Sequence, residues 1–229
     1  MKKKELNLLF LRCNRLKIEK KMIKETPERE FEDPNDFYTD LEAKRYDSNS
    51  GMKRTQIELT NIILNLFLED TKNLKKDISI LDIGCGTGFS LEFLKEKDYK
   101  RLIGIEPAKE MLKIAKNKKF ACYFGGFLDI PKEIKKQKFD LIISVSALQW
   151  ILTNKQEMEI KNSIKKIGKD LKEILNENGR IIIQYYPPTP NASKTLVSSF
   201  ERIGLKAREY LYNKGNKKKE KHILILKHR

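Results

Sequence analysis

Ser79-Ile80-Leu81-Asp82-Ile83-Gly84-Cys85-Gly86-Thr87-Gly88 is the stretch that decides the fold of this 229-residue chain. Its first half is a short apolar run rich in β-branched residues, which is typical of a parallel strand covered on both faces. The alternating glycines that follow let the backbone turn sharply and approach a ligand closely. The amphipathic run around Leu91, Phe93 and Leu94 then indicates the start of a helix. Strand, glycine loop and helix together predict a cofactor site of the Rossmann kind.

The spacing of the glycines distinguishes between two kinds of cofactor. A dinucleotide fingerprint reads G-x-G-x-x-G and places a pyrophosphate at the helix N-terminus. Here the pattern is G-x-G-x-G, and Phe89 stands where the third dinucleotide glycine would fall. Asp82, just before the loop, would repel a pyrophosphate but suits a ligand that carries an ammonium group. Glu106 ends the next predicted strand, about 20 residues after the loop, where a ribose-binding carboxylate is expected.

This combination resembles motif I of the class I S-adenosylmethionine-dependent methyltransferases, whose glycine backbone holds the methionine part of the cofactor. The resemblance implies that Asp82 helps to hold the amino group of S-adenosylmethionine and that Glu106 accepts hydrogen bonds from both ribose hydroxyls. The alternative is an α/β domain in which the glycines only form a turn. The cofactor-binding residues that we expect are Arg45, Tyr46, Asp82, Gly84, Cys85, Gly86, Gly88, Glu106, Pro107, Phe127, Asp129 and Ser144.

Strands and helices alternate along the rest of the chain, which predicts an α/β fold: a Rossmann-like sheet of seven strands, doubly wound, with an antiparallel last strand. We expect helices at residues 41–46, 55–68, 108–117, 156–175 and 192–203, and strands at 78–83, 101–106, 120–124, 139–145, 180–185, 205–211 and 222–226. Pro27 and Pro34 make the linker at 26–36 a poor helix. The chain then divides into a basic N-terminal extension and linker (1–36), helices that cap the cofactor site (37–76) and the methyltransferase domain (77–229).

The composition restricts the classes of protein to which the chain can belong. No apolar run approaches the roughly 20 residues of a membrane span, and the apolar part of the N-terminus is too short for a signal peptide. We therefore expect no membrane association and a cytoplasmic location, nuclear as well in a eukaryote. Cys13, Cys85 and Cys122 are too few and too scattered for a disulfide framework or a metal site.

The net charge of +16 indicates a class of partner. A strongly basic surface attracts phosphate backbones, so we expect the chain to bind nucleic acid. The alternative is a lysine-rich composition in which many lysines only solvate helix faces.

Three further stretches narrow the substrate. They are residues 37–50 (FYTDLEAKRYDSNS), 142–150 (IISVSALQW) and 184–187 (QYYP). Together they resemble the family of small-subunit ribosomal RNA (guanine-N7)-methyltransferases. The resemblance implies an enzyme that methylates guanine N7 in the RNA of the pre-small ribosomal subunit during ribosome biogenesis. It also implies a heterodimer with a small zinc-ribbon methyltransferase activator protein.

Methylation at guanine N7 demands little acid–base chemistry. The nitrogen has a free lone pair and no proton to lose, so no catalytic acid or base is expected. The target base must be unstacked, and aromatic faces can then hold it. The candidates for positioning the substrate base are Tyr38, Tyr46, Trp150, Tyr185 and Tyr186. For each of them the alternative is an ordinary core aromatic.

The chain departs from the family pattern at one position of the cofactor site. Family members usually carry an acid after the glycine that ends the third strand, and this chain has Gly126 there. Asp129 is the candidate to reach the adenine amine instead, and stacking by Phe127 or Ile105 can still hold the ring, so we expect weaker cofactor binding. Two alternatives stay open: a methyltransferase acting on a small molecule, a protein or transfer RNA, and a ribosome-assembly factor whose catalysis is secondary.

Overall fold

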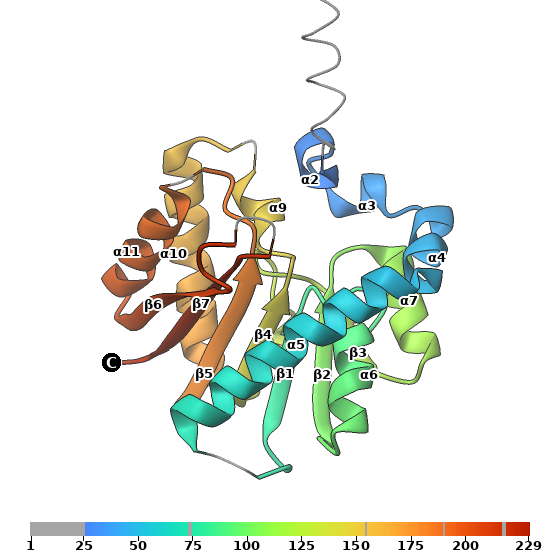
Figure 1. The fold of residues 1–229 in the computed structure, drawn as a ribbon, viewed down its shortest axis with the longest axis horizontal. Helices are drawn as coiled ribbons and strands as arrows, with labels where there is room; N and C mark the ends of the chain where they lie inside the picture. The colour runs from blue at the N-terminus through green and yellow to red at the C-terminus, as the bar shows by residue number, and fades with distance from the viewer. Residues whose placement is uncertain (1–25, 73–74, 154, 190, 217–218) are drawn as a thin grey trace, which may run out of the picture.

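The computed structural model describes residues 26–72, 75–153, 155–189, 191–216 and 219–229 (Figure 1). The predicted basic extension at 1–25, with Cys13, lies outside the described residues. Seven strands form one sheet in the order β3-β2-β1-β4-β5-β7-β6. The strands are β1 (Ser79–Ile83), β2 (Arg101–Glu106), β3 (Ala121–Phe124), β4 (Phe139–Val145), β5 (Leu175–Tyr185), β6 (Leu205–Tyr212) and β7 (Lys221–His228).

Strands β1 to β5 run parallel, and β7 is antiparallel to both of its neighbours, β5 and β6. The predicted doubly wound sheet with an antiparallel last strand is therefore confirmed. The helices that connect or precede the strands are α2 (Pro27–Glu30), α3 (Pro34–Phe37), α4 (Asp40–Ser48), α5 (Ser50–Thr71), α6 (Phe89–Glu96), α7 (Lys109–Asn117), α8 (Lys132–Lys135), α9 (Gln149–Leu152), α10 (Glu157–Ile174) and α11 (Ala192–Arg202).

The central strands are buried on both faces, because side chains alternate along a strand and helices cover each side. Ile80, Ile143 and Ile182 belong to the core that α5 and α6 close. Their neighbours in sequence point the other way, into the core that α10 and α11 close. Among the described residues, no helix is both long and apolar enough to cross a membrane.

The linker at 26–36 is more ordered than its prolines predict, and the expectation of a poor helix is wrong. Two single-turn helices, α2 and α3, each begin at a proline. Proline is favourable at the first helical position, because the N–H that it lacks has no intrahelical partner there. The carboxylate of Asp33 also caps α3 by accepting a hydrogen bond of 2.8 Å from the N–H of Asn35.

Helix α5 begins at Ser50, well before the predicted start at residue 55. The side chain of Asn49 accepts hydrogen bonds from the N–H groups of Gly51 (3.0 Å) and Met52 (3.1 Å), which satisfies the first donors of the helix. At the other end of the sheet, β5 begins at Leu175, five residues before the predicted start at residue 180. The register of the pairing between β4 and β5 shifts there, because Phe139 of β4 pairs with Leu175 and Leu141 pairs with Arg180.

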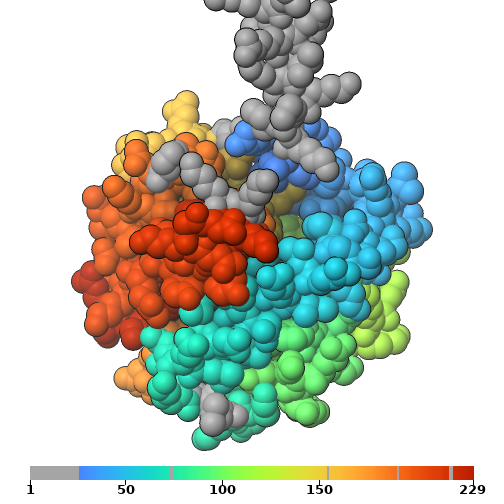
Figure 2. All heavy atoms as spheres, in the orientation of Figure 1, coloured from blue at the N-terminus to red at the C-terminus, as the bar shows by residue number. Residues whose placement is uncertain are grey.

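The carboxyl ends of β1, β2, β4 and β5 meet at one edge of the sheet, with α2 and α3 beyond that edge (Figure 1). In the space-filling view, α5 runs diagonally across the molecule, and the β6–β7 hairpin lies at the surface beside it (Figure 2). The layers thus place the loops that follow the parallel strands under the N-terminal helices. A ligand site is expected at such an edge of an α/β sheet.

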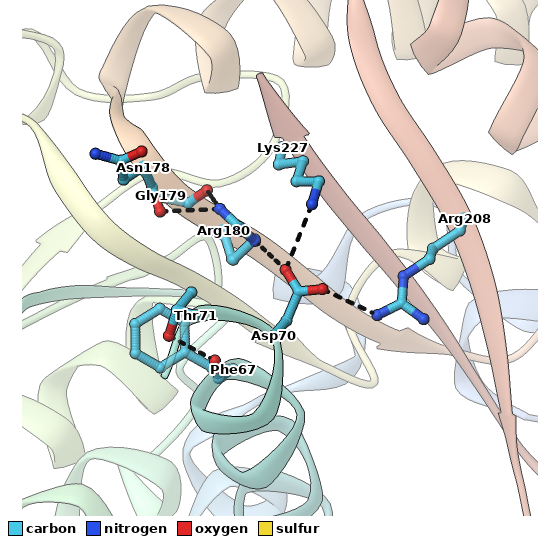
Figure 3. A network of polar contacts seen from close by, with 8 residues as sticks. All are labelled: Phe67, Asp70, Thr71, Asn178, Gly179, Arg180, Arg208 and Lys227. Carbon is cyan, nitrogen blue, oxygen red and sulfur yellow. Dashed lines mark hydrogen bonds and ion pairs between the residues drawn. The ribbon is translucent and has the colours of Figure 1, made fainter. Parts of the chain in front are cut away.

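The opposite end of α5 is anchored to the C-terminal strands by one carboxylate, that of Asp70 (Figure 3). Its oxygens contact the guanidinium of Arg180 on β5, Arg208 on β6 (3.4 Å) and Lys227 on β7 (3.7 Å). The hydrogen bond from Arg180 and the surrounding positive charge hold the pKa of Asp70 below its usual range. Helix α5 is therefore held against strands β5, β6 and β7.

Candidate active site

A cavity of about 1500 Å³ lies at the carboxyl edge of the sheet. Its walls come from the glycine loop, the turns after β2, β3, β4 and β5, and the N-terminal segment from α2 to the start of α5. The structure brings most of the residues predicted for the cofactor or the substrate base into this lining: Tyr38, Arg45, Tyr46, Gly84, Cys85, Gly86, Glu106, Pro107, Phe127, Asp129, Trp150 and Tyr186.

The glycine loop lies flat against the sheet edge. The N–H groups of Gly84 (2.8 Å) and Cys85 (3.1 Å) donate to the carbonyl of Ile105 on β2. The backbone of Gly84 has φ of +77°, and a Cβ there would lie 2.4 Å from the Cβ of Ala147. Only glycine fits this position, both because of its left-handed backbone and because of the close approach.

Asp82 lies behind the loop, at the end of β1, and is 1% exposed. One oxygen of its carboxyl group, Oδ2, has no hydrogen-bond partner among the residues that the structure describes. Burial, and then the nearby charge of Glu106, raise the pKa of Asp82 to about 8. A buried polar atom without a partner is costly, so the carboxyl group is suited to receive a cationic donor from a ligand.

Glu106 ends β2 and reaches into the same cavity. One carboxylate oxygen accepts from the N–H of Gly86 (2.8 Å) and the other from the N–H of Ala108 (2.9 Å). Burial raises its pKa to about 7, although these two hydrogen bonds act in the opposite direction. Each oxygen keeps an unused lone pair. The side chain is thus held rigidly while it can still accept from two hydroxyl groups.

Helix α4 is held against the glycine loop through Phe89. The rings of Tyr46 and Phe89 stack with centroids 5.7 Å apart and planes inclined by 19°. The ammonium group of Lys118 lies over the Phe89 ring, 4.7 Å from its centroid. Lys118 also pairs with Asp47 (2.6 Å) and Glu92 (2.8 Å). These contacts hold Tyr46 at the cavity wall. Burial there raises the pKa of its hydroxyl group.

Aromatic rings also line the outer part of the cavity. Tyr38 lies with its centroid 6.1 Å from that of Trp150 and 6.1 Å from that of Tyr46. The ring centroids of Phe37 and Tyr38 lie 4.8 Å apart. The ring planes of Tyr38 and Trp150 are inclined by 50°, and both residues line the cavity, where a planar base could stack on one of the rings.

A family model described as a methyltransferase domain matches residues 74–226. The chain belongs to the methyltransferase domain family. The match covers the glycine loop, Glu106 and the turns after β3, β4 and β5, and the predicted class of enzyme is confirmed.

Curated relatives of this methyltransferase include several ribosomal RNA enzymes. It is 26% identical to "18S rRNA (guanine-N(7))-methyltransferase bud23" of Schizosaccharomyces pombe, with 84% of this chain and 71% of that protein covered. It is 26% identical to the probable 18S rRNA (guanine-N(7))-methyltransferase of Dictyostelium discoideum, with 84% and 67% covered. The Bos taurus 18S rRNA (guanine-N(7))-methyltransferase is 29% identical, with 75% and 60% covered. The chain thus spans only part of the length of these relatives.

Solved structures support the fold of the methyltransferase. Magnesium protoporphyrin IX methyltransferase from Synechocystis, crystallised with bound S-adenosylmethionine, superposes with a TM-score of 0.61 at 14% identity, over 90% of this chain and 99% of that one. DesVI of Streptomyces venezuelae gives a TM-score of 0.59 at 14% identity, over 76% and 92%.

Four predicted residues of the methyltransferase do not line the cavity. Asp82 lies behind the loop, and Gly88 packs against Phe120. The buried hydroxyl of Ser144 donates to the carbonyl of Ile83 (2.7 Å). Tyr185 is fully buried, and its hydroxyl contacts Ser193 (2.8 Å) and Glu209 (3.1 Å) on the other side of β5. Their roles toward a ligand stay predictions.

Two cavity residues were not assigned a role from the sequence. Ser146 has φ of +55°, a strained backbone for a residue with a side chain, and its hydroxyl bonds the side chain of Gln184 (2.7 Å). Gln149 donates through Nε2 to the carbonyl of Ser146 (2.9 Å), and its buried Oε1 has no hydrogen-bond partner in the described part of the chain. Both belong to the quoted stretch at 142–150, but the letters alone do not show which side chains point inward.

Proposed function

We propose that this methyltransferase transfers a methyl group from S-adenosylmethionine to N7 of a guanine in small-subunit ribosomal RNA during ribosome biogenesis. The observation that carries the proposal is the match to relatives named as 18S rRNA (guanine-N(7))-methyltransferases, which covers 84% of the chain in Schizosaccharomyces pombe and in Arabidopsis thaliana. The cavity supports it, because it combines buried carboxyl groups with aromatic faces.

The cavity residues fit S-adenosylmethionine, which when bound supplies a methyl group activated on a positively charged sulfur. The unpartnered oxygen of Asp82 suits the ammonium group, and the free lone pairs of Glu106 suit the ribose hydroxyls. Gly84 leaves the space that a Cβ would fill. Arg45 and Tyr46 face the methionine end, and Phe127 and Asp129 face the adenine end of the proposed arrangement.

Guanine N7 needs no general base, since its lone pair attacks directly. The contribution of the protein is to align the reacting atoms and to exclude water. We assign the alignment of the base to Tyr38 and Trp150, which both line the cavity, as do Tyr46 and Tyr186. Gln149 adds polarity to the recognition, because its free Oε1 can accept a hydrogen bond from the N–H groups on the Watson–Crick edge of guanine.

Replacing Gln149 with leucine tests this recognition. The variant keeps the side-chain size but lacks the acceptor, so methyl transfer to RNA is expected to fall at least about tenfold, the cost of a neutral hydrogen bond lost in a buried site. Cofactor affinity should stay unchanged. Gln137→Leu is the matched control, since the amide of Gln137 also donates to a backbone carbonyl (Glu133, 3.1 Å), far from the cavity. Equal rates of methyl transfer for the two variants would show that Gln149 does not take part in recognition of the base.

The reaction itself is tested with labelled S-adenosylmethionine and unmethylated small-subunit RNA, followed by mass spectrometry of the modified base. N7-methylguanosine at one position is the expected product. Methyl transfer to another base, or cofactor binding without transfer to RNA, would contradict the proposed substrate.

A second candidate function is methylation of a carboxylate oxygen on a carrier-bound acyl group. The chain is 30% identical to the malonyl-[acyl-carrier protein] O-methyltransferase of Acetivibrio thermocellus over 57% of its length. The ribosomal relatives cover more of the chain, 84% for the Schizosaccharomyces pombe protein. An assay with malonyl-[acyl-carrier protein] as the methyl acceptor separates the two. If transfer to RNA fails and subunit maturation still requires the chain, the function is instead that of an assembly factor.

We also propose a heterodimer with a small zinc-ribbon activator protein, acting where small ribosomal subunits assemble: in the cytoplasm, and in the nucleus of a eukaryote. Strand β3 lies at the edge of the sheet, and Phe124 at its end is 49% exposed, with Leu128 nearby in sequence at 38%. Exposed apolar groups at an open strand edge favour a protein partner.

Co-expression with the zinc-ribbon protein is therefore expected to raise the soluble yield several-fold and to give a 1:1 complex in sedimentation. Phe124→Ser should prevent complex formation, because it removes the exposed ring at the sheet edge. Met158→Ser, which changes another exposed apolar residue (66%) on α10, should leave the complex intact. A soluble, stable monomer that ignores the partner would argue against the heterodimer.

A further inference from the structure

The β6–β7 hairpin presents a basic and aromatic surface on the side of the sheet that α5 covers. Because side chains alternate along a strand, every second residue of β6 points to that side, and the register pairs these residues with Lys227, Ile225, Ile223 and Lys221 of β7. We call the polar members of this set the hairpin face: Lys206, Arg208, Tyr210, Tyr212, Lys221 and Lys227.

Helix α5 covers only part of this side. The two tyrosines pack with their inner edges against the core beneath α5. The side chains of Arg208 and Lys227 remain 54% and 39% exposed, and Lys206 is exposed. Figure 2 shows the hairpin at the surface next to α5. The hairpin face is thus accessible from solvent.

Positive charge accumulates on the hairpin face beyond what the fold needs. Lys206 lies directly opposite Lys227, and like charges on directly opposed residues destabilise a sheet. Asp70 contacts Arg180, Arg208 and Lys227, so three cations share one carboxylate (Figure 3). Lys206 forms no ion pair with any described residue. The repulsion would be relieved by a polyanion.

The hairpin face is continuous with the cavity through Tyr186. The ammonium of Lys221 lies 5.6 Å from the centroid of that ring. Tyr186 is 41% exposed and also lines the cavity. From Tyr212 to Lys206 the face extends about 20 Å along β6, at roughly 3.3 Å per residue. A strand whose base occupies the cavity can therefore leave it over Tyr186 and follow β6.

We propose that the hairpin face binds the RNA strand that flanks the target guanine, with its lysines and Arg208 on phosphates and its tyrosines against bases or sugars. The proposal rests on the proposed function and adds to it the surface on which the substrate lies. Backbone contacts of this kind supply affinity and register rather than base identity.

The test is the salt dependence of RNA affinity, measured by fluorescence anisotropy with a labelled single-stranded fragment of small-subunit RNA. The double variant Lys206→Gln with Lys221→Gln should bind about tenfold more weakly at low salt. Its slope of log affinity against log salt should be lower by about 1.4, since a single strand contributes about 0.7 per phosphate contact. The matched control is Lys165→Gln with Lys169→Gln, two exposed lysines of α10 on the opposite side of the sheet. Cofactor affinity reports correct folding of both.

Equal losses in the two double variants, or no loss in either, would overturn the assignment of the hairpin face. The assignment would also be overturned if the Lys206→Gln, Lys221→Gln variant lost binding to the zinc-ribbon protein and kept its binding to RNA, because the face would then be a protein interface. Failure of the proposed function is visible separately in the unmodified chain, as cofactor binding without RNA binding or RNA methylation.

Discussion

Gly84→Ala is expected to lower cofactor affinity by about a hundredfold and to abolish methyl transfer at ordinary cofactor concentrations. The left-handed backbone costs an alanine about 1–2 kcal/mol, and overpacking adds about 1–3 kcal/mol. Its Cβ would lie 2.4 Å from that of Ala147, so the loop must leave the carbonyl of Ile105 that now fixes it. Titration calorimetry, or the fluorescence of Trp150, the single tryptophan of the chain, measures the affinity.

Gly126→Ala is the matched control for this prediction. Gly126 lines the same cavity, but a Cβ there would meet only Pro107, at an ordinary 3.6 Å. The cofactor affinity of this variant should remain within about twofold of the unmodified chain, because no neighbouring atom has to move for the added methyl group, and substitutions that disturb no packing change the free energy by about 0.5 kcal/mol or less. If both variants lose binding alike, the general shape of the cavity, and not the approach at Gly84, would explain the effect.

Cofactor binding is also expected to depend on pH through Asp82 and Glu106. Their pKa values of about 8 and about 7 mean that both carry protons in the empty protein below neutral pH. The ammonium of the cofactor favours the charged form of Asp82, so binding releases a proton. Affinity should therefore rise with pH between 5.5 and 7.5, by up to about tenfold per unit for each proton released. An α-amino group, with a pKa of about 7.7–8.0, remains largely charged in that window.

Asp82→Asn tests the sign of this effect. The variant cannot release the proton, so its affinity should be lower at pH 7.5 and should vary less with pH. The stability of the empty protein should change in the opposite direction. An acid whose folded pKa is raised loses stability as pH rises from its unfolded value, about 3.9, toward 8. Asp82→Asn should therefore melt at a higher temperature than the unmodified chain near pH 7.5. An unchanged slope would place the titrating group elsewhere.

The sequence predicted the sheet because its signals are local. The glycine loop fixes the first strand, and the alternation of apolar runs with helical faces orders the rest. The starts of α3 and α5 were missed because they depend on caps from Asp33 and Asn49, and single polar letters do not show which one caps a helix.

The backbone part of the candidate site was predictable for the same reason, whereas the direction of several of its side chains was not. In β5, residues on both faces are buried, so the apolar pattern does not show that Tyr185 points toward Ser193 and away from the cavity. Gln149 and Ser146 matter through a strained turn after β4, and that geometry arises only when β4 and β5 pair. The sequence does single out Phe89, because it stands directly after the glycine loop. It does not show the partners of this ring, Tyr46 and Lys118, which are distant in sequence.

The order of the strands has a consequence for synthesis. Strand β7 follows β5 and β6 along the chain, yet it lies between them in the sheet and supplies Lys227 to Asp70. Until β7 has been synthesised, the edge of β5 stays open and β6 has no strand to join. Pairings between such distant segments form slowly, and open strand edges promote aggregation. We therefore expect this part of the sheet to form only after β7 has been synthesised, so that chains truncated before Lys221 are left to chaperones and proteases.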